Sequence, residues 1–155
     1  IHMFIYLILT DNEIWGVVHV IKQVTPYLYF NGTCEEALAF YSEALDGSVR
    51  ESQTYGDAGI TAEDPKRILH AQLEVNGHIL MFSDVPNNDE SLNKNHNIYV
   101  VLDFEQEEQI KEVYEIFKKE GQVQVELDKM FWGQTYAKVI DKFGIGWDFS
   151  YTHQE

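Results

Sequence analysis

Two polar side chains alternate with apolar ones along a segment that is typical of a β-strand. In residues 68–75, Ala71 and Leu73 point to one face and His70 and Gln72 to the other, because successive strand side chains alternate in direction. An imidazole that titrates near neutral pH, close to an amide, suits the wall of a ligand cavity. A partly exposed polar sheet face would show the same pattern, so both interpretations stay open.

Asp148 has a comparable position near the carboxyl end of the chain. Trp147, Phe149 and Tyr151 share one face of the strand expected at 146–151 and suit packing under a helix. Asp148 therefore points to the opposite face. There its carboxylate could accept a hydrogen bond from a ligand, or it could be solvated.

Aromatic residues add candidates for a ligand-binding surface. Tyr27 and Tyr29 alternate along the strand expected at 25–30, and Trp132 lies in the segment Met130-Phe-Trp-Gly133. Tyrosines in strands commonly serve packing instead. The Trp132 segment fits either an aromatic lid over a cavity or packing in the core and at a dimer interface.

Composition narrows the class of protein. The chain has 155 residues and a formal charge of −15, which argues against nucleic acid and anionic membranes as partners, since both bind clustered lysine and arginine. The single cysteine, Cys34, cannot form an internal disulfide and has no apparent histidine partner. We therefore expect a cytoplasmic location and no catalytic thiol. No apolar run is long enough for a transmembrane helix.

These candidate residues are positioned by a pattern of elements that occurs twice. The first half is expected to form a strand, a helix and three strands, at residues 25–30, 33–47, 48–55, 68–75 and 78–83. The second half repeats this order at residues 96–102, 105–119, 122–127, 135–140 and 146–151. Residues 33–36 have the spacing of a capping box, and Gly47 and Gly121 are expected to end the two helices. Asn76-Gly77 predicts a tight hairpin.

The two halves also match residue by residue. Residues 77–83 (GHILMFS) align without gaps with residues 144–150 (GIGWDFS), which pairs Met81 with Asp148. Chance similarity of two hairpins is the alternative. A repeated supersecondary unit cannot bury its sheet face alone, so we expect both copies to share one core in an α+β fold of two tandem βαβββ modules.

The amino-terminal residues differ from this repeat. Ile1-His2-Met3 has the form of a cloning remnant, and the residues that follow fit either an extra strand or the upstream extension of a domain that begins near Val20. The expected division of the chain, as one structural domain, is an extension (1–24), a first module (25–84), a linker (85–95) and a second module (96–152).

Three segments resemble a known family. They are PYLYFNGTCEEALAFYSEALDG, HAQLEVNGHILMFSD and GQVQVELDKMFWGQTYAKVIDKFGIGW. The last contains DKFGIGW where the family has D-P-F-G-x-x-W, with Lys142 in place of the proline. Over residues 25–152 the chain resembles the PhnB-like branch of the glyoxalase/bleomycin-resistance (vicinal oxygen chelate) superfamily. This resemblance implies two curved sheets around a cavity, and a homodimer.

The resemblance also implies positions for metal ligands, because metal-dependent members use the first and last strand of each half. The family's D-P-x-G-x-x-x-E spacing places one ligand at Asp148. The equivalent residue in the first half is Met81, whose thioether is a soft ligand and cannot substitute for a carboxylate in binding a hard or borderline metal. The remaining positions fall near Thr25 and near His96 to Ile98. Only His96 and Asp148 could then coordinate, and two ligands rarely hold a catalytic metal.

We therefore expect a protein that binds a small hydrophobic or aromatic molecule without metal in the cavity between the sheets. The expected ligand-binding residues are Tyr27, Tyr29, His70, Gln72, Met81, Trp132 and Asp148. The alternative is a metal-dependent lyase, isomerase, dioxygenase or thiol transferase that uses His96 and Asp148, with His70 as a third ligand if its strand reaches the cavity.

Overall fold

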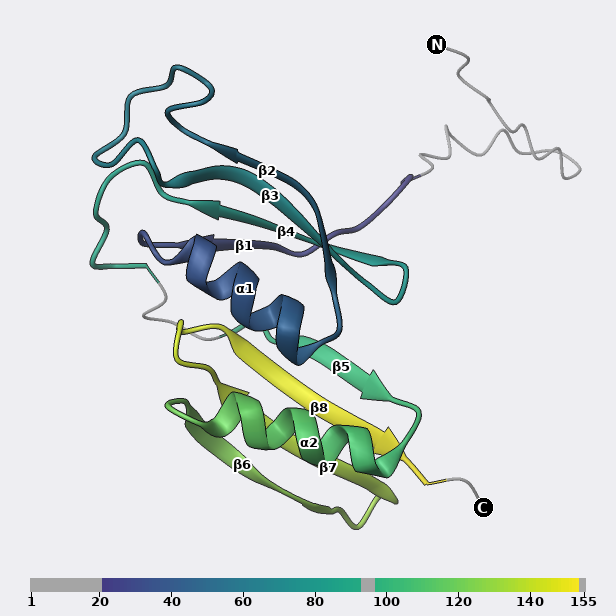
Figure 1. Cartoon of the computed structure of the whole chain (residues 1–155). Helices are drawn as coiled ribbons and strands as arrows, with labels where there is room; N and C mark the ends of the chain where they lie inside the picture. Colours follow the sequence, from purple (N-terminus) through teal and green to yellow (C-terminus); the bar gives the residue numbers. More distant parts are fainter. Residues whose placement is uncertain (1–20, 93–96, 154–155) are drawn as a thin grey trace, which may run out of the picture.

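The computed structural model describes residues 21–92 and 97–153, and it confirms the α+β class and the repeated order of elements (Figure 1). The first module contains β1 (Tyr27–Phe30), α1 (Cys34–Ala44), β2 (Ser48–Thr54), β3 (Ile68–Val75) and β4 (His78–Asp84). The second contains β5 (Val100–Phe104), α2 (Glu107–Lys118), β6 (Gln122–Lys129), β7 (Gln134–Ile140) and β8 (Gly146–Thr152). The predictions for residues 1–20 and for His96 lie outside the described residues.

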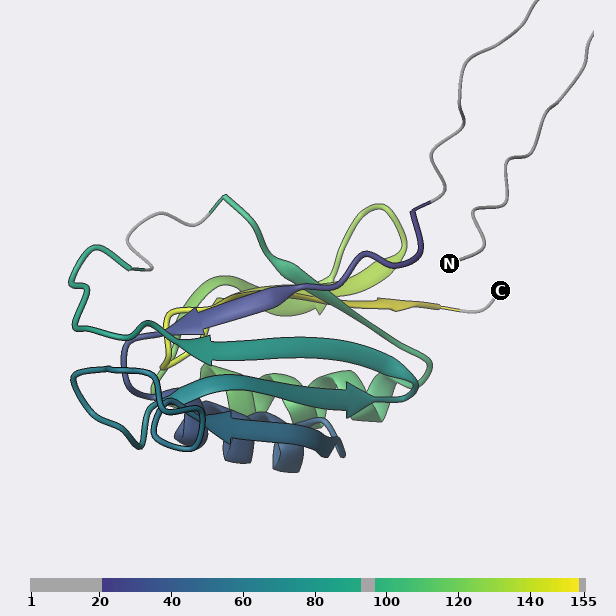
Figure 2. The same ribbon diagram turned by 90° about the horizontal axis from the view of Figure 1, so that it is seen from above.

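Each module forms one four-stranded mixed sheet. The strand order is β1-β4-β3-β2 in the first module and β5-β8-β7-β6 in the second. Both helices lie on the same side of the two sheets (Figure 2), and β1 and β5 are the edges that face each other (Figure 1). The other face of each sheet is covered by no described helix, and within residues 21–92 and 97–153 no helix could cross a membrane.

Strand register confirms the internal repeat. Ala71 on β3 pairs with Phe82 on β4, and Ala137 on β7 pairs with Phe149 on β8. The residues directly before the two phenylalanines therefore occupy equivalent positions, as the gap-free alignment predicts. These four side chains face the helices and are completely buried.

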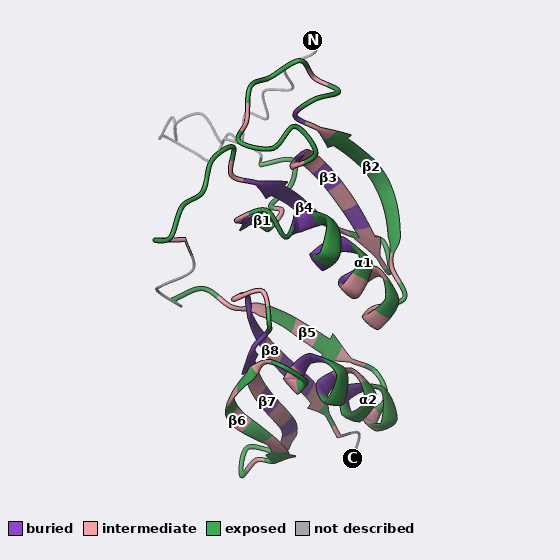
Figure 3. Cartoon of the chain, turned by 60° about the vertical axis from the view of Figure 1, so that its left-hand side comes forward, coloured by how far each residue is buried: buried purple, intermediate pink, exposed green. Residues whose placement is uncertain are grey.

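Aromatic side chains join the two modules into one core on the helix side. Tyr41 on α1, Phe117 on α2 and Trp147 on β8 are fully buried. The ring centroids of Tyr41 and Trp147, and those of Phe117 and Trp147, are 5.2 Å apart. Figure 3 shows buried positions on β3, β4, β7 and β8, whereas β2 is exposed along most of its length. The expectation of a shared core is therefore correct.

A buried carboxylate adds one hydrogen bond across the same boundary. Asp141 Oδ2 accepts hydrogen bonds from the Tyr41 hydroxyl and, at 2.7 Å, from Trp147 Nε1. Its Oδ1 accepts from the backbone N–H groups of Phe143 and Ile145 at 2.9 and 3.0 Å. These four donors compensate for burying the charge. The segment DKFGIGW thus fixes how the two modules meet.

The capping box predicted at the start of α1 is not formed. Thr33 makes no side-chain capping hydrogen bond. Instead the buried Asp84 carboxylate, at the end of β4, accepts from the backbone N–H groups of Gly32 and Cys34 at 2.8 and 3.1 Å. It also accepts from Ile68 at 2.9 Å. A side chain distant in sequence therefore satisfies donors at this helix end.

The helix ends also correct the predicted role of two glycines. Asp46 and Glu120, not the glycines that follow them, take the left-handed conformation, with φ of 51° and 63°. Gly47 and Gly121 serve close packing instead. A Cβ at Gly47 would lie 3.0 Å from a leucine of β3, and one at Gly121 would lie 2.7 Å from a backbone carbonyl of α2. The hairpin at Asn76-Gly77 is confirmed, with φ of 46° and 80°.

Candidate functional site

The uncovered face of the first sheet brings together five of the predicted residues, Tyr27, Tyr29, His70, Gln72 and Met81. Register places Met81 beside Tyr27 on one side and Gln72 on the other. The Tyr27 hydroxyl lies 2.8 Å from His70 Nδ1, and the rings of Tyr27 and Tyr29 stack with centroids 4.8 Å apart. The prediction that His70 and Gln72 share a face away from the core is therefore correct.

Glu51 on β2 adds a carboxylate to this face that the sequence analysis did not single out. Its Oε2 lies 3.4 Å from Gln72 Nε2 and 4.0 Å from His70 Nε2. Because β2 is exposed on both faces, its sequence carries no alternation that would have revealed Glu51. Burial, followed by the nearby Tyr29, raises the pKa of Tyr27, so this hydroxyl stays protonated at neutral pH.

The uncovered face of the second sheet is centred on Asp148. Val101 on β5 and Lys138 on β7 flank it. Lys138 Nζ lies 3.7 Å from Asp148 Oδ1 and 4.4 Å from the ring centroid of Tyr99. Among the described residues, Asp148 Oδ1 is a buried side-chain atom with no hydrogen-bond partner. A buried acceptor without a donor costs free energy, so it requires an explanation.

The Tyr99 ring is held in place beside this pair. Its hydroxyl donates to Gln124 Oε1 at 2.8 Å. A Cβ at Gly146 would lie 2.6 Å from the ring, so only glycine at this position of β8 leaves room for it. Tyr99 and Lys138 were missed because their proximity depends on pairing between strands.

Neighbouring groups on the second face shift the pKa values of Lys138 and Tyr136. Burial lowers the pKa of Lys138, but the Asp148 carboxylate and the Tyr136 hydroxyl outweigh it, and the net shift is upward. Burial, followed by the Asp148 carboxylate, raises the pKa of Tyr136. At neutral pH this face therefore presents an ammonium group and a neutral phenol beside Asp148.

Trp132 lies in the hairpin between β6 and β7, at the margin of the second face. Its ring centroid is 5.9 Å from that of Tyr136, and its Nε1 donates to Gln134 Oε1 at 3.0 Å. Trp132 is half exposed and Phe131, the residue before it, is 97% exposed. The lid and the dimer contact both stay predictions for this hairpin.

The described residues do not fit a metal ion at Asp148. Its neighbour on β5 is Val101, which offers no ligand atom, and its neighbour on β7 is the cationic Lys138. In residues 21–92 and 97–153 no three histidine, cysteine or acidic side chains are grouped as a metal site would require. Register also makes Tyr99 the repeat mate of Thr25, which corrects the expectation of a mate at His96 to Ile98.

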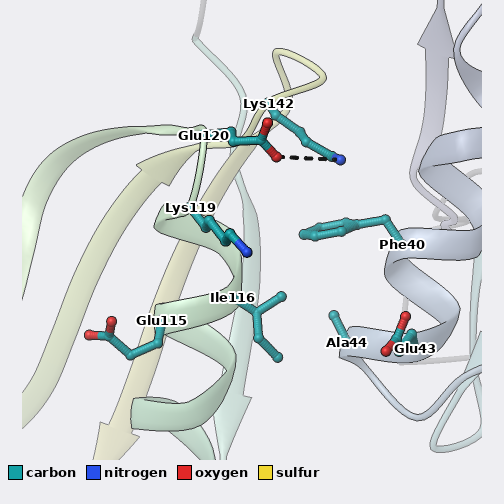
Figure 4. A pocket seen from close by; sticks show the side chains of 8 residues that line it. All are labelled: Phe40, Glu43, Ala44, Glu115, Ile116, Lys119, Glu120 and Lys142. Atoms are coloured by element: carbon teal, nitrogen blue, oxygen red, sulfur yellow. Dashed lines mark ion pairs between the residues drawn. The ribbon is translucent and has the colours of Figure 1, made fainter.

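A pocket of about 410 Å³ lies elsewhere, on the helix side between α1 and α2 (Figure 4). Its lining residues are Phe40, Glu43, Ala44, Glu115, Ile116, Lys119, Glu120 and Lys142. None of them was predicted as a ligand-binding residue. Lys142, which stands where the family has proline, lies 3.8 Å from Glu120 Oε2 and 3.2 Å from Glu36 Oε1. Its charge is thus engaged by the protein itself.

Cys34 is fully buried at the start of α1. Burial, followed by the nearby Asp84 carboxylate, raises the pKa of its thiol. A thiol that resists ionisation is a poor nucleophile. The side chain therefore serves packing of the first module.

Two tandem βαβββ modules with both helices on one side define a paired-module α+β fold. Residues 17–149 match the family model of the Glyoxalase/Bleomycin resistance protein/Dioxygenase superfamily. The chain belongs to this superfamily.

Three relatives refine this assignment. Protein YjdN from Escherichia coli (strain K12) is 27% identical over 145 residues, which cover 85% of this chain and 97% of that protein. Protein PA1353 from Pseudomonas aeruginosa is 28% identical, with a TM-score of 0.75 and coverage of 85% and 98%. A PhnB protein from Bacillus cereus has a TM-score of 0.75 at 23% identity, with coverage of 84% and 100%. The resemblance to PhnB-like proteins is thereby confirmed.

Proposed function

We propose that this protein binds a small apolar or aromatic molecule on the sheet faces that point away from the helices, without a metal ion. The observation that carries the proposal is the chemistry of those faces. Half-exposed rings of Tyr27, Tyr29 and Trp132 accompany a few polar groups. Ligand sites commonly combine apolar walls with sparse polar groups that orient the ligand.

A second copy of the chain completes the site in this proposal. In one chain the two sheets lie edge to edge (Figure 1), and their uncovered faces both point away from the helices (Figure 2). Each face therefore needs an opposing surface to become a cavity wall. Exposed apolar side chains on or beside these faces, including Val101 at 61% and Phe131 at 97%, suit such a contact.

The buried free Cys34 suits a cytoplasmic location.

Binding of the neutral fluorescent probe N-phenyl-1-naphthylamine tests the site. The emission of the probe should increase with this protein, and Tyr29→Ala and Trp132→Ala should weaken binding several-fold. Ile116→Ala is the control, since Ile116 is an exposed apolar residue on the helix side. Loss of binding in Ile116→Ala alone would place the ligand in the pocket of Figure 4 and contradict the proposal.

Metal analysis separates the proposal from the alternative of a metal-dependent enzyme. Protein purified without a polyhistidine tag should contain no stoichiometric zinc, nickel, manganese or iron. Stoichiometric metal that is lost on Asp148→Ala would favour the enzyme, with His96 supplying a further ligand.

The oligomeric state tests the second copy. Sedimentation should show a dimer that dissociates on Val101→Glu, because the new charge would face the opposing surface. A monomer at all concentrations that still binds the probe would remove the dimer from the proposal and leave the binding site in place.

A further inference from the structure

Asp148 and Lys138 form an incomplete pair on the second face. Their charged atoms are 3.7 Å apart, which is too long for a hydrogen bond, and Asp148 Oδ1 has no hydrogen-bond partner among the described residues. The Asp148 side chain is 19% exposed to solvent, and the Lys138 side chain is 29% exposed. A donor that reached Oδ1 would satisfy the unpaired acceptor.

The surroundings restrict what that donor can be. Asp148 and Lys138 carry opposite charges that compensate each other, so a ligand with a net charge would leave one of them without a counter-ion. A neutral ligand with a donor and an acceptor on one edge would serve both groups. Tyr99 and Tyr136 lie close to the pair, and the Trp132 ring centroid lies 5.9 Å from that of Tyr136. These rings favour a flat ligand.

We propose that the second face recognises a neutral planar ligand through an amide-type edge, with Asp148 accepting from its N–H and Lys138 donating to its carbonyl oxygen. This inference rests on the proposed function and specifies its ligand class. Lys138 reaches the carbonyl by a rotation of its flexible side chain away from Tyr99, 4.4 Å from its amino group. No covalent step is involved.

Three matched probes test this edge by NMR titration of the full chain. Quinolin-2(1H)-one carries the donor and the acceptor, 1-methylquinolin-2-one lacks the donor, and quinoline lacks both the N–H donor and the carbonyl group. We expect the first probe to bind about tenfold more tightly than the other two, since a hydrogen bond to a charged group contributes on this order. This comparison uses the unaltered protein, so it does not depend on the folding of any variant.

Variants of the two side chains then test whether Asp148 and Lys138 cause the preference for quinolin-2(1H)-one. Asp148→Asn and Lys138→Met should each reduce the tenfold preference to about onefold to threefold. Lys111→Met is the matched control for Lys138→Met, because it removes one ammonium group from α2, on the helix side of the second sheet. Asp103→Asn, on the neighbouring strand, controls for the loss of one negative charge, and both controls should keep the preference.

The outcomes distinguish this inference from the function on which it rests. Equal binding of the three probes would overturn the amide-type edge and leave the aromatic site standing. If none of the three bound although N-phenyl-1-naphthylamine did, only the amide-type edge would be wrong. If that probe also failed to bind, both proposals would be wrong. If Asp148→Asn instead weakened dimerisation without changing the preference, the unpaired oxygen would belong to the contact with the second copy, which also overturns the inference.

Discussion

The two modules are alike where they face their helices and different where they face away. Ala71 and Ala137 occupy matching positions in the core, whereas on the uncovered faces Met81 corresponds to Asp148. Packing under a helix tolerates little change in volume, but an uncovered face has no such constraint. The repeat therefore supplies one scaffold with two chemically distinct surfaces, and changes at equivalent positions can test this view.

The largest loss of stability is expected when either of the two buried carboxylates is removed. Asp141→Ala should lower the free energy of unfolding by about 4 kcal/mol, because four donors, one of them in the other module, lose their acceptor. Asp84→Ala removes the acceptor of three backbone donors that all lie in the first module and should cost about 3 kcal/mol. Urea denaturation measures both values.

Tyr41→Phe isolates the contribution that crosses between the modules. It removes only the hydroxyl that donates to Asp141 and should cost about 1.5 kcal/mol. An Asp141→Ala variant no less stable than Tyr41→Phe would contradict the importance of the remaining three donors.

The next largest losses of stability are expected at the two glycines that follow the helices. Gly121→Ala places a Cβ 2.7 and 2.8 Å from two backbone carbonyl oxygens, whereas at Gly47 the nearest atom, at 3.0 Å, belongs to a leucine side chain. A side chain can move more easily than a backbone. We expect losses of about 3 kcal/mol for Gly121→Ala and about 1 kcal/mol for Gly47→Ala, and thermal unfolding in the reverse order would refute this explanation.

Copying the first face onto the second should stabilise the protein slightly. The double variant Asp148→Met with Lys138→Gln reproduces the Met81 and Gln72 arrangement. It also removes a buried acceptor that no donor in residues 21–92 or 97–153 satisfies. A gain of about 1 kcal/mol in unfolding free energy is expected, together with loss of the amide preference. A loss of stability would mean that the charged pair contributes to folding rather than to recognition.

The smallest effect is expected on the first face. Tyr27→Phe removes the hydroxyl that lies 2.8 Å from His70 Nδ1, and Tyr27 is 38% exposed. Because water can replace this partner, the variant should change stability by less than about 0.5 kcal/mol. A larger loss in chemical denaturation would show that the Tyr27–His70 contact is structural.

The sequence predicted the repeated elements well because the physical signals are local. Alternation identified the strand faces of His70 and Asp148, and Asn76-Gly77 identified a hairpin whose φ values confirm it. The roles of Gly47 and Gly121 could not be predicted, since they depend on contacts with distant segments.

Part of the candidate site was also within reach of the sequence. The turn at residues 141–144 pairs Ile140 with Gly146, and counting outward from it places Lys138 opposite Asp148. Glu51 gave no such signal, because β2 is exposed and irregular in its pairing. The side-by-side placement of the sheets depends on the aromatic core between modules, which no local pattern encodes.

The Tyr41–Asp141 hydrogen bond has a consequence for biosynthesis. Tyr41 is translated about 100 residues before its acceptor, so the first module emerges from the ribosome with this hydroxyl and the surrounding aromatic rings unmatched. That module must wait for the DKFGIGW segment before its helix-side core is sealed. A chain that stalls between the two modules would therefore present an apolar surface to chaperones and proteases until synthesis resumed.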